Sequence, residues 1–468
     1  MCPCSRTIPP GVGCDLNVFK KTFSVLSVFL LLAELVSAEP AAPLVFSPED
    51  RVMVIAPHPD DESLGLGGLL QTIKAAGASV KIIYLTNGES NEVSALFYEK
   101  RPLVLRSDFL KSGLVRKNEA LSAMASIGIS AKDLIFLGYP DGGTLNIWLK
   151  YWARSKPFRS FFTRINKVPY ADAYSYGHPY KGEAIVRDFE RLLLSETPTH
   201  VFVTAPFDLN RDHQAAFLFF QTALYDVAAQ LPVLPKLHLY VVHAHGWPSP
   251  GKYLPDAPLG IPPNIDWNGE VRWHSYALNR EETQKKQQLI LQYKSQIAYK
   301  KNFLLSFARS NEIFFDYPHE QVERQPLTGG SLESFEIGTR QGDVRYRVLG
   351  NELWIGVPLS NSLDEMGALT TYVFSHRRDF LFSDMPKLAF KLFGNKLFTY
   401  DGFRPLHDPG LQYTLDKGIL VIRVPLRLLK NPDYLFVSTR NAKEALSLDF
   451  GSWKALELAH DEAGKTLL

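Results

Sequence analysis

Residues 54–68 read VIAPHPDDESLGLGG, and this stretch decides how the rest of the chain is interpreted. Its apolar start is typical of a buried strand, and a Gly-rich apolar segment follows its polar centre. The polar centre contains four ionisable residues, His58, Asp60, Asp61 and Glu62. Ionisable groups at the end of a buried strand destabilise a fold unless they are solvated, paired or bound to a metal. The stretch therefore predicts a strand that ends at a functional site.

Four other apolar runs also end in polar, loop-forming residues, at 80–85, 134–137, 200–204 and 237–242. Helical patterns lie between most of these runs, at 63–75, 116–126, 181–194 and 214–230. Strands that alternate with helices predict an α/β fold with a mainly parallel sheet and helices on both faces. Such sheets bind ligands where loops leave the carboxyl ends of the strands, and the polar clusters fall in those loops.

The C-terminal part of the chain has a different pattern. Residues 281–307 predict one long helix. Beyond about residue 327, apolar segments alternate around Gly-Asn and Lys-Gly turns, which predicts an antiparallel β-sandwich-like domain. We therefore expect an α/β domain over residues 45–315, which would hold the site, and a β-rich accessory domain over residues 327–468.

The N-terminal segment has the layout of a secretory signal. Lys20 and Lys21 precede an uncharged run at 22–33, and small residues follow at 36–38. The run is too short to span a bilayer, so we expect a signal peptide over residues 1–38 that is cleaved; an uncleaved anchor is the alternative. All three cysteines lie before residue 15, so the exported protein would contain no disulfide. The expected location is secreted, periplasmic or at the cell surface.

The overall charge gives little indication of a charged macromolecular partner. The chain has 51 Lys and Arg against 49 Asp and Glu, a formal charge of +2. Without a strong positive field, we expect no nucleic-acid partner. We also expect no stable membrane anchor after signal cleavage, and the sequence does not indicate the oligomeric state.

His58 and Asp61 are candidate metal ligands. They are three residues apart on a turn that enters a helix, so both can face one side. Neutral imidazole and carboxylate bind divalent metals, zinc above all, and a catalytic zinc site takes three protein ligands. The third ligand must come from another loop at the same edge of the sheet, and His213 is the best candidate. Asp212 would then fix the tautomer of the His213 imidazole.

Asp60 remains beside these ligands and points differently from them. It is the candidate general base for water that the metal acidifies. The alternative for this whole cluster is a capped helix start with solvated carboxylates.

Four motifs occur in a consistent order along the chain: PHPDDE at 57–62, TNGE at 86–89, Arg116-x-x-Glu119, and DLNRDHQAA at 208–216. Over roughly residues 50–310 the sequence resembles the PIG-L / LmbE-like family of zinc-dependent N-deacetylases. The resemblance implies a Rossmann-like sheet and the removal of acetyl or related acyl groups from amino sugars and their conjugates.

The resemblance also implies roles for individual residues. By match, the zinc ligands are His58, Asp61 and His213, and the general base is Asp60. Arg116 and Asp141 match positions where relatives contact substrate. Each has a structural alternative, because Arg116 can pair with Glu119 on a helix surface and Asp141 suits a turn in its own right.

One position departs from the family pattern. Many relatives have a histidine three residues before the last ligand, and here that residue is Asn210. An amide can donate a hydrogen bond to an oxyanion, but it cannot become an imidazolium. His243 or His245, in the loop after the next strand, is the candidate for supplying the missing charge.

The sequence thus predicts an exported, zinc-dependent amidohydrolase that removes an N-acetyl group from an amino sugar within an oligosaccharide, polysaccharide or glycoconjugate. One alternative is a catalytically weak, metal-containing glycan-binding protein in which the β-rich domain binds the glycan. The other is the same chemistry on another N-acyl amide, such as a thiol conjugate or a long-chain acyl group.

Overall fold

The computed structural model describes residues 44–90, 105–153, 155–263, 271–317, 319–330, 333–336, 344–359, 368–394, 396–407, 410–416, 418–441 and 452–459. The predicted signal peptide at 1–38 lies outside these residues. Among the helices of the described residues, none has both the length and the apolar character needed to cross a membrane.

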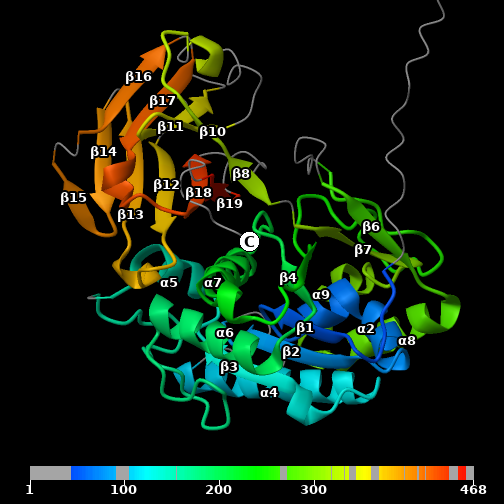
Figure 1. Cartoon of the computed structure of the whole chain (residues 1–468). Coiled ribbons are helices and arrows are strands. Elements are labelled where there is room, and N and C mark those ends of the chain that lie inside the picture. Colours follow the sequence, from blue (N-terminus) through cyan, green and yellow to red (C-terminus); the bar gives the residue numbers. More distant parts are fainter. Residues whose placement is uncertain are drawn as a thin grey trace, which may run out of the picture. The chain divides into compact units, whose positions relative to one another are not determined.

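The first sheet has seven strands in the order β3-β2-β1-β4-β5-β7-β6 (Figure 1). The strands are β1 (Arg51–Ala56), β2 (Ser79–Thr86), β3 (Leu134–Tyr139), β4 (His200–Thr204), β5 (Lys236–Tyr240), β6 (Trp273–Ala277) and β7 (Asn311–Asp316). The first five run parallel to their neighbours. This confirms the predicted mainly parallel sheet. The antiparallel pairs of β7 with β5 and with β6 were not predicted.

Eight α-helices accompany this sheet in the described residues. They are α1 (Asp61–Leu66), α2 (Leu69–Ala75), α4 (Arg106–Ala125), α5 (Thr144–Lys150), α6 (Gly182–Glu196), α7 (Arg211–Val227), α8 (Arg280–Gln292) and α9 (Lys294–Leu305). Successive residues of β1, β2 and β4 are buried, so both faces of the sheet are covered. This burial is why the strands appear in the sequence as continuous apolar runs.

The prediction of a single helix over residues 281–307 is wrong, because the helix is interrupted at Tyr293, between α8 and α9. Tyr293 is buried with non-helical dihedrals (φ −79°, ψ 62°), and its hydroxyl donates to Oε1 of Glu62. Apolar periodicity continues on both sides of the break, and a pattern of that kind does not detect a tertiary hydrogen bond. Beyond the break, Gln296 and Lys300 of α9 line the same cavity as His58.

The C-terminal region forms two further sheets, in the orders β16-β17-β11-β10-β9 and β15-β14-β13-β12-β18-β19-β8. Their strands are β8 (Glu320–Val322), β9 (Arg324–Gln325), β10 (Arg345–Leu349), β11 (Glu352–Pro358), β12 (Ala368–His376), β13 (Lys387–Phe393), β14 (Lys396–Asp401), β15 (Arg404–Leu406), β16 (Gln412–Asp416), β17 (Ile419–Pro425), β18 (Tyr434–Asn441) and β19 (Lys454–Leu458). Most pairs are antiparallel, and apolar side chains of both sheets form one buried cluster. This confirms the predicted β-sandwich-like region.

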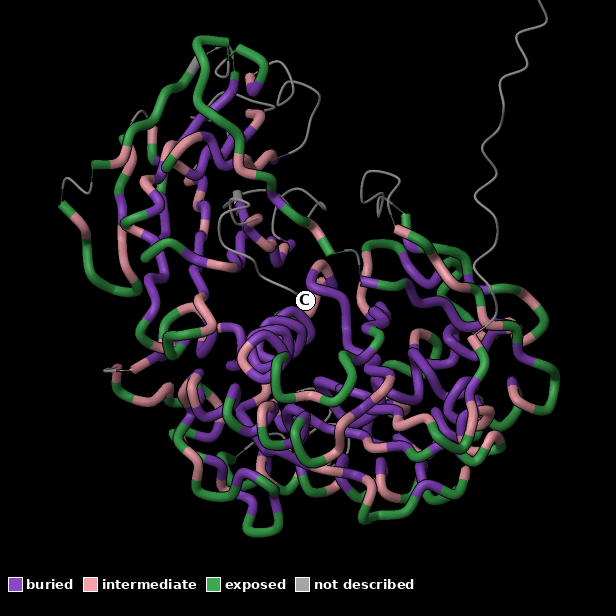
Figure 2. Tube along the Cα trace, viewed as in Figure 1, coloured by how far each residue is buried: buried purple, intermediate pink, exposed green. Residues whose placement is uncertain are grey.

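Helix α7 is buried along almost its whole length, as Figure 2 shows. A helix that is apolar on all sides needs packing partners on all sides. The Trp148 ring of α5 lies 5.3 Å from the ring of Phe219 on α7, and 5.1 Å from those of Phe382 and Phe436 in the β-rich region. The apolar core therefore continues from the α/β region into the β-rich region, and residues 41–468 form one compact unit.

Candidate active site

The loops that follow β1 to β5 surround a cavity of about 630 Å³ at the carboxyl edge of the parallel sheet. Its lining comprises His58, Asp60, Asp61, Leu64, Ser90, Arg116, Asp141, Gly142, Phe161, Phe162, Asn210, Arg211, Asp212, His243, Gln296, Lys300, Phe303 and Leu304. The position agrees with the rule that ligands of parallel α/β sheets bind at this edge. The aromatic rings of Phe161, Phe162 and Phe303 form apolar parts of the wall that the sequence did not indicate.

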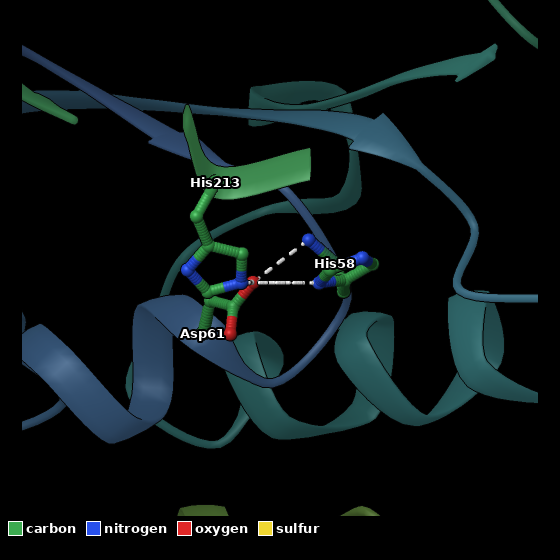
Figure 3. Close-up of side chains that lie close together, drawn as sticks. All are labelled: His58, Asp61 and His213. Carbon is green, nitrogen blue, oxygen red and sulfur yellow. Dashed lines mark hydrogen bonds and ion pairs between the residues drawn. The ribbon is translucent and has the colours of Figure 1, made fainter. Parts of the chain in front are cut away.

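The three predicted metal ligands lie close together (Figure 3), and two of them, His58 and Asp61, line this cavity. Oδ2 of Asp61 lies 3.2 Å from Nδ1 of His58 and 3.1 Å from Nε2 of His213. The two imidazole nitrogens are 3.3 Å apart, and all three residues are buried. Ligand atoms of a tetrahedral zinc site with bonds of about 2.0–2.1 Å are themselves about 3.3 Å apart, so this group fits such an ion.

The turn between β1 and α1 fixes two of these ligands. The backbone N–H of His58 donates to Oδ2 of Asp61 (2.9 Å), which holds the carboxylate under the imidazole. Asp60, between them, has φ 130°, a value that non-glycine residues rarely adopt. Strained conformations of this kind persist where the surrounding structure enforces them, and they are frequent at functional sites.

The other nitrogen of His58 faces two carboxylates. Nε2 lies 3.2 Å from Oδ1 of Asp141 and 3.3 Å from Oδ2 of Asp212. Burial by itself disfavours the charged imidazole, but Asp141, Asp212 and Asp61 raise the pKa of His58 well above its usual value. His58, Asp141 and Asp212 form a second group able to hold a metal ion. We assign Asp141 and Asp212 to positioning His58. Their group contains one imidazole, whereas the group of His58, Asp61 and His213 contains two and is the better zinc site.

The predicted role of Asp212 beside His213 is wrong. Its carboxylate accepts hydrogen bonds from the backbone N–H groups of Gly142 (2.7 Å) and Thr144 (3.0 Å) and from the Thr144 hydroxyl. It therefore fixes the loop after β3 and contacts His58 instead. Because Asp212 directly follows the first residue of α7, its side chain leaves the helix in a direction different from that of its neighbour His213.

Asp208, rather than Asp212, is the acid beside the Nδ1 atom of His213. It is fully buried, and its Oδ2 lies 3.2 Å from Nδ1 of His213. Burial lowers the pKa of His213, but Asp208 and Asp61 outweigh this effect and raise it to about 9. Surroundings that favour a proton on an imidazole also favour a metal cation bound to it. The only indication of this contact in the sequence was that an aspartate stands five residues before His213.

Asp60 is held by a cation rather than by the metal ligands. Its Oδ1 accepts from Nη2 of Arg116 (3.0 Å), and its backbone N–H donates to Oε2 of Glu62 (3.2 Å). Burial raises the pKa of Asp60 to about 6, with Arg116 opposing the shift. Arg116 also donates to the carbonyl of Gly88, while Glu119 accepts from Ser295, so the alternative Arg116–Glu119 pair does not form.

Asn210 is the N-cap residue of α7 and also lines the cavity. Its side-chain oxygen accepts from the N–H of Asp212 (2.8 Å), so the amide NH₂ is the group it can offer to a ligand. His243 lines the cavity too, 4.9 Å from the ring of His213, and burial lowers its pKa to about 4. This environment disfavours the imidazolium that the sequence analysis expected. His245 is exposed and is not part of the lining.

Residues 53–224 match the model of the PIG-L family, described as GlcNAc-PI de-N-acetylase. The 1D-myo-inositol 2-acetamido-2-deoxy-alpha-D-glucopyranoside deacetylase of Kineococcus radiotolerans is 35% identical over 92 residues, 20% of this chain and 23% of that protein. The deacetylase of the same name from Mycobacterium avium is 37% identical over 79 residues, 17% of this chain and 25% of that protein. The matches therefore span about a quarter of the length of these relatives.

Solved structures of deacetylases are also similar to the chain, at low scores. The match to the N,N'-diacetylchitobiose deacetylase of Pyrococcus horikoshii covers 57% of this chain and 83% of that protein, with 16% identity and a TM-score of 0.35. The match to the zinc inhibited form of teicoplanin deacetylase Orf2 covers 57% of this chain and 97% of that protein, with 15% identity and a TM-score of 0.38. Likeness at these scores does not bear on function.

Proposed function

We propose that the PIG-L family domain of this chain, at residues 53–224, is a zinc-dependent deacetylase of an N-acetylated amino sugar, alone or within an oligosaccharide, polysaccharide or glycoconjugate. One observation carries the proposal. The atoms of His58, Asp61 and His213 converge on one side of a cavity that also holds the Asp60 carboxylate. The names of the family model and of the relatives support the choice of an acetamido sugar.

His58, Asp61 and His213 would hold the zinc ion. When bound, zinc supplies Lewis acidity, which polarises an amide carbonyl and acidifies water beside it. Asp141 and Asp212 hold the far side of the His58 ring, and Asp208 holds that of His213. Such partners orient ligating imidazoles and fix which nitrogen carries the proton.

Asp60 would act as the general base. Arg116 donates to its Oδ1, and no described residue donates a hydrogen bond to its Oδ2, which leaves that oxygen to accept a proton from water. As the water oxygen bonds to the acetamide carbon, the proton passes to Asp60. The carbon–nitrogen bond then breaks, Asp60 returns the proton to the sugar nitrogen, and acetate and the free amine result. The NH₂ of Asn210 would donate a hydrogen bond to the developing oxyanion.

The proposal includes export. The basic residues, uncharged run and small residues before position 39 form a signal sequence, which would place the enzyme outside the cytoplasm. Extracellular and cell-surface glycans would then be within its reach.

The decisive experiment measures acetate release from N-acetylglucosamine and its oligomers by the zinc-loaded protein, before and after treatment with a chelator. Acetate release that chelation abolishes and zinc restores supports the proposal. The Asp60→Asn variant serves as the matched control, since it keeps the proposed ligands and lacks the base. Binding of the oligomers without acetate release would instead identify a glycan-binding protein.

A further inference from the structure

Two cationic side chains line the cavity in addition to Arg116. Arg211 is the first residue of α7, and Lys300 lies on α9 where the backbone leaves helical geometry (φ −120°, ψ 22°). Both side chains are exposed, whereas the candidate metal ligands are buried. The two cations therefore stand in the outer part of the cavity, on elements that are far apart in the sequence.

Nζ of Lys300 lies 5.3 Å from the centre of the Tyr299 ring, a contact that leaves the ammonium charge without a neutralising partner. Within the part of the chain that the structure describes, no carboxylate lies within ion-pair distance of Arg211 or Lys300. Other surface lysines do have such partners, and Nζ of Lys285 lies 2.9 Å from Oε1 of Glu281. Arg116, in the same cavity, donates to Asp60 and to the carbonyls of Gly88 and Pro59.

Further contacts place positive charge close to Arg211 and close to the reacting groups. Arg440 of β18 donates to Oε1 of Gln214 (2.8 Å), one turn along α7 from Arg211. Burial, with a smaller contribution from the charge of Arg211, lowers the pKa of Arg440 to about 10. Lys300 lines the same cavity as Asp60. Like charges held together destabilise a fold, and a bound anion removes the penalty.

We propose that Arg211 and Lys300 form an anion subsite, and that the amino sugar carries a negatively charged substituent or is linked to a negatively charged residue. The inference rests on the deacetylase function proposed above. The shared ligand chemistry is an oxyanion, either a carboxylate of a neighbouring uronic acid or a sulfate or phosphate ester on the sugar. A guanidinium and an ammonium group both donate charge-assisted hydrogen bonds to such oxygens.

The test compares kcat/KM for acetate release from matched substrates: N-acetylglucosamine, its 6-sulfate, its 6-phosphate, and a disaccharide in which it is linked to glucuronate. For at least one charged substrate, we expect kcat/KM to exceed that of the neutral sugar about tenfold, the effect of one charge-assisted hydrogen bond. Raising the salt concentration from about 0.05 M to about 0.5 M should reduce this preference, because both cations are exposed. The preferred arm identifies the source of the anion.

The variants Arg211→Gln and Lys300→Gln should each reduce kcat/KM for the preferred charged substrate about tenfold. Activity on N-acetylglucosamine should change less than about threefold. Lys301→Gln is the matched control, because Lys301 is the exposed neighbour of Lys300 and does not line the cavity. Calorimetric binding of the same sugars to Asp60→Asn gives a second readout that does not require turnover.

Several outcomes would overturn the inference. Equal kcat/KM on neutral and charged sugars, unchanged in both variants, rules out the anion subsite and leaves the deacetylase function standing. A parallel loss on all substrates together with loss of zinc would show that the two cations only balance the acids around the metal site. If no sugar releases acetate and none binds to Asp60→Asn, the proposed function and the subsite both fail.

Discussion

Both ends of the parallel sheet hold histidines beside aspartates, yet the two clusters differ in geometry. At the carboxyl end, atoms of His58, Asp61 and His213 converge to within 3.3 Å of one another at the wall of a cavity. At the amino end of β4, His200 lies beside His238 of β5. Among the described residues, the groups that can hold a metal ion are both at the carboxyl end.

At the amino end, the contacts follow one another in a chain. Nδ1 of His200 lies 3.0 Å from Nε2 of His238, and Nδ1 of His238 lies 2.7 Å from Oδ1 of Asp316. The other oxygen of Asp316 lies 2.9 Å from Nε2 of His274. Each contact uses a different atom, so the three imidazoles do not point to a common centre. A cluster rich in His and Asp is therefore not in itself a metal site.

The closeness of the carboxylates to each imidazole separates the two clusters further: Asp61 and Asp208 lie 3.1 and 3.2 Å from His213, whereas Asp50 lies 3.7 Å from His200. Despite burial, Asp208 and Asp61 raise the pKa of His213 to about 9. At the other end, burial lowers the pKa of His200 to about 4, and the neighbouring His238 adds to the shift. The carboxyl end thus attracts a cation, whereas the amino end keeps His200 neutral.

The largest expected difference between the two clusters is in metal content. His213→Ala or Asp61→Ala should remove most of the bound metal and reduce activity to background, because two protein ligands hold an ion much less tightly than three. His238→Ala and His274→Ala, at the amino end, should keep about one zinc ion per chain. Elemental analysis of the purified proteins measures this. Full metal content in both His213→Ala and Asp61→Ala would show that the ligands are assigned wrongly.

The next largest effect should be on turnover without loss of metal. Asp60→Asn should lower kcat about 10²–10⁴-fold, the usual contribution of a positioned general base. Its zinc content should remain that of the wild type, because Asp60 pairs with Arg116 and is not one of the proposed ligands. Asp61→Asn is the matched comparison and should lose metal. If Asp60→Asn loses metal while Asp61→Asn retains it, the roles of the two acids are exchanged.

A smaller effect should follow from the acid behind His213. Asp208→Asn should weaken zinc affinity about 10–100-fold, because the amide no longer supplies the charge that orients the ligating imidazole. Competition with a chelator of known affinity measures the change. Asp316→Asn applies the same substitution to the acid beside His238 and should leave zinc affinity unchanged. Equal zinc affinity in Asp208→Asn and the wild type would limit Asp208 to joining the loops after β4 and β5.

The sequence predicted the features that depend on local patterns. The continuous apolar runs gave the five parallel strands, and the spacing of His58 and Asp61 placed two ligands on one turn. The sequence also predicted His213 as the third ligand, because His213 follows another of these strands and lies at the start of a helix. Each of these inferences needs only the rule that parallel strands end at the same edge.

The features that the sequence analysis missed depend on long-range contacts. Asp208 lies behind His213 because the backbone N–H groups of Val242 and His243 donate to it across two loops. At the break between α8 and α9, Tyr293 donates a hydrogen bond to Glu62, which is far away along the chain. The packing of the Trp148 ring against the β-rich region is another long-range contact that the sequence did not predict. Residue patterns identify strands and helices, but they do not show which side chains meet.

The smallest expected effect concerns stability at the amino end. His200 is buried and faces His238, Asp50, Lys236 and Asp316, and its pKa is lowered from 6.5 to about 4. Between these values the unfolded chain binds a proton that the folded chain does not, so this group destabilises the fold as the pH falls through that window. Because solvent screens part of the interaction, we expect a loss on the order of 1 kcal/mol. Urea unfolding at about pH 7 and about pH 4.5 measures this loss of stability.

The variant His200→Gln should remove this part of the pH dependence, whereas His245→Gln, at an exposed position on the loop after β5, should keep it. If His200→Gln and the wild type lose stability equally between the two pH values, His200 is protonated in the folded protein, and the contrast between the two ends of the sheet rests on geometry alone.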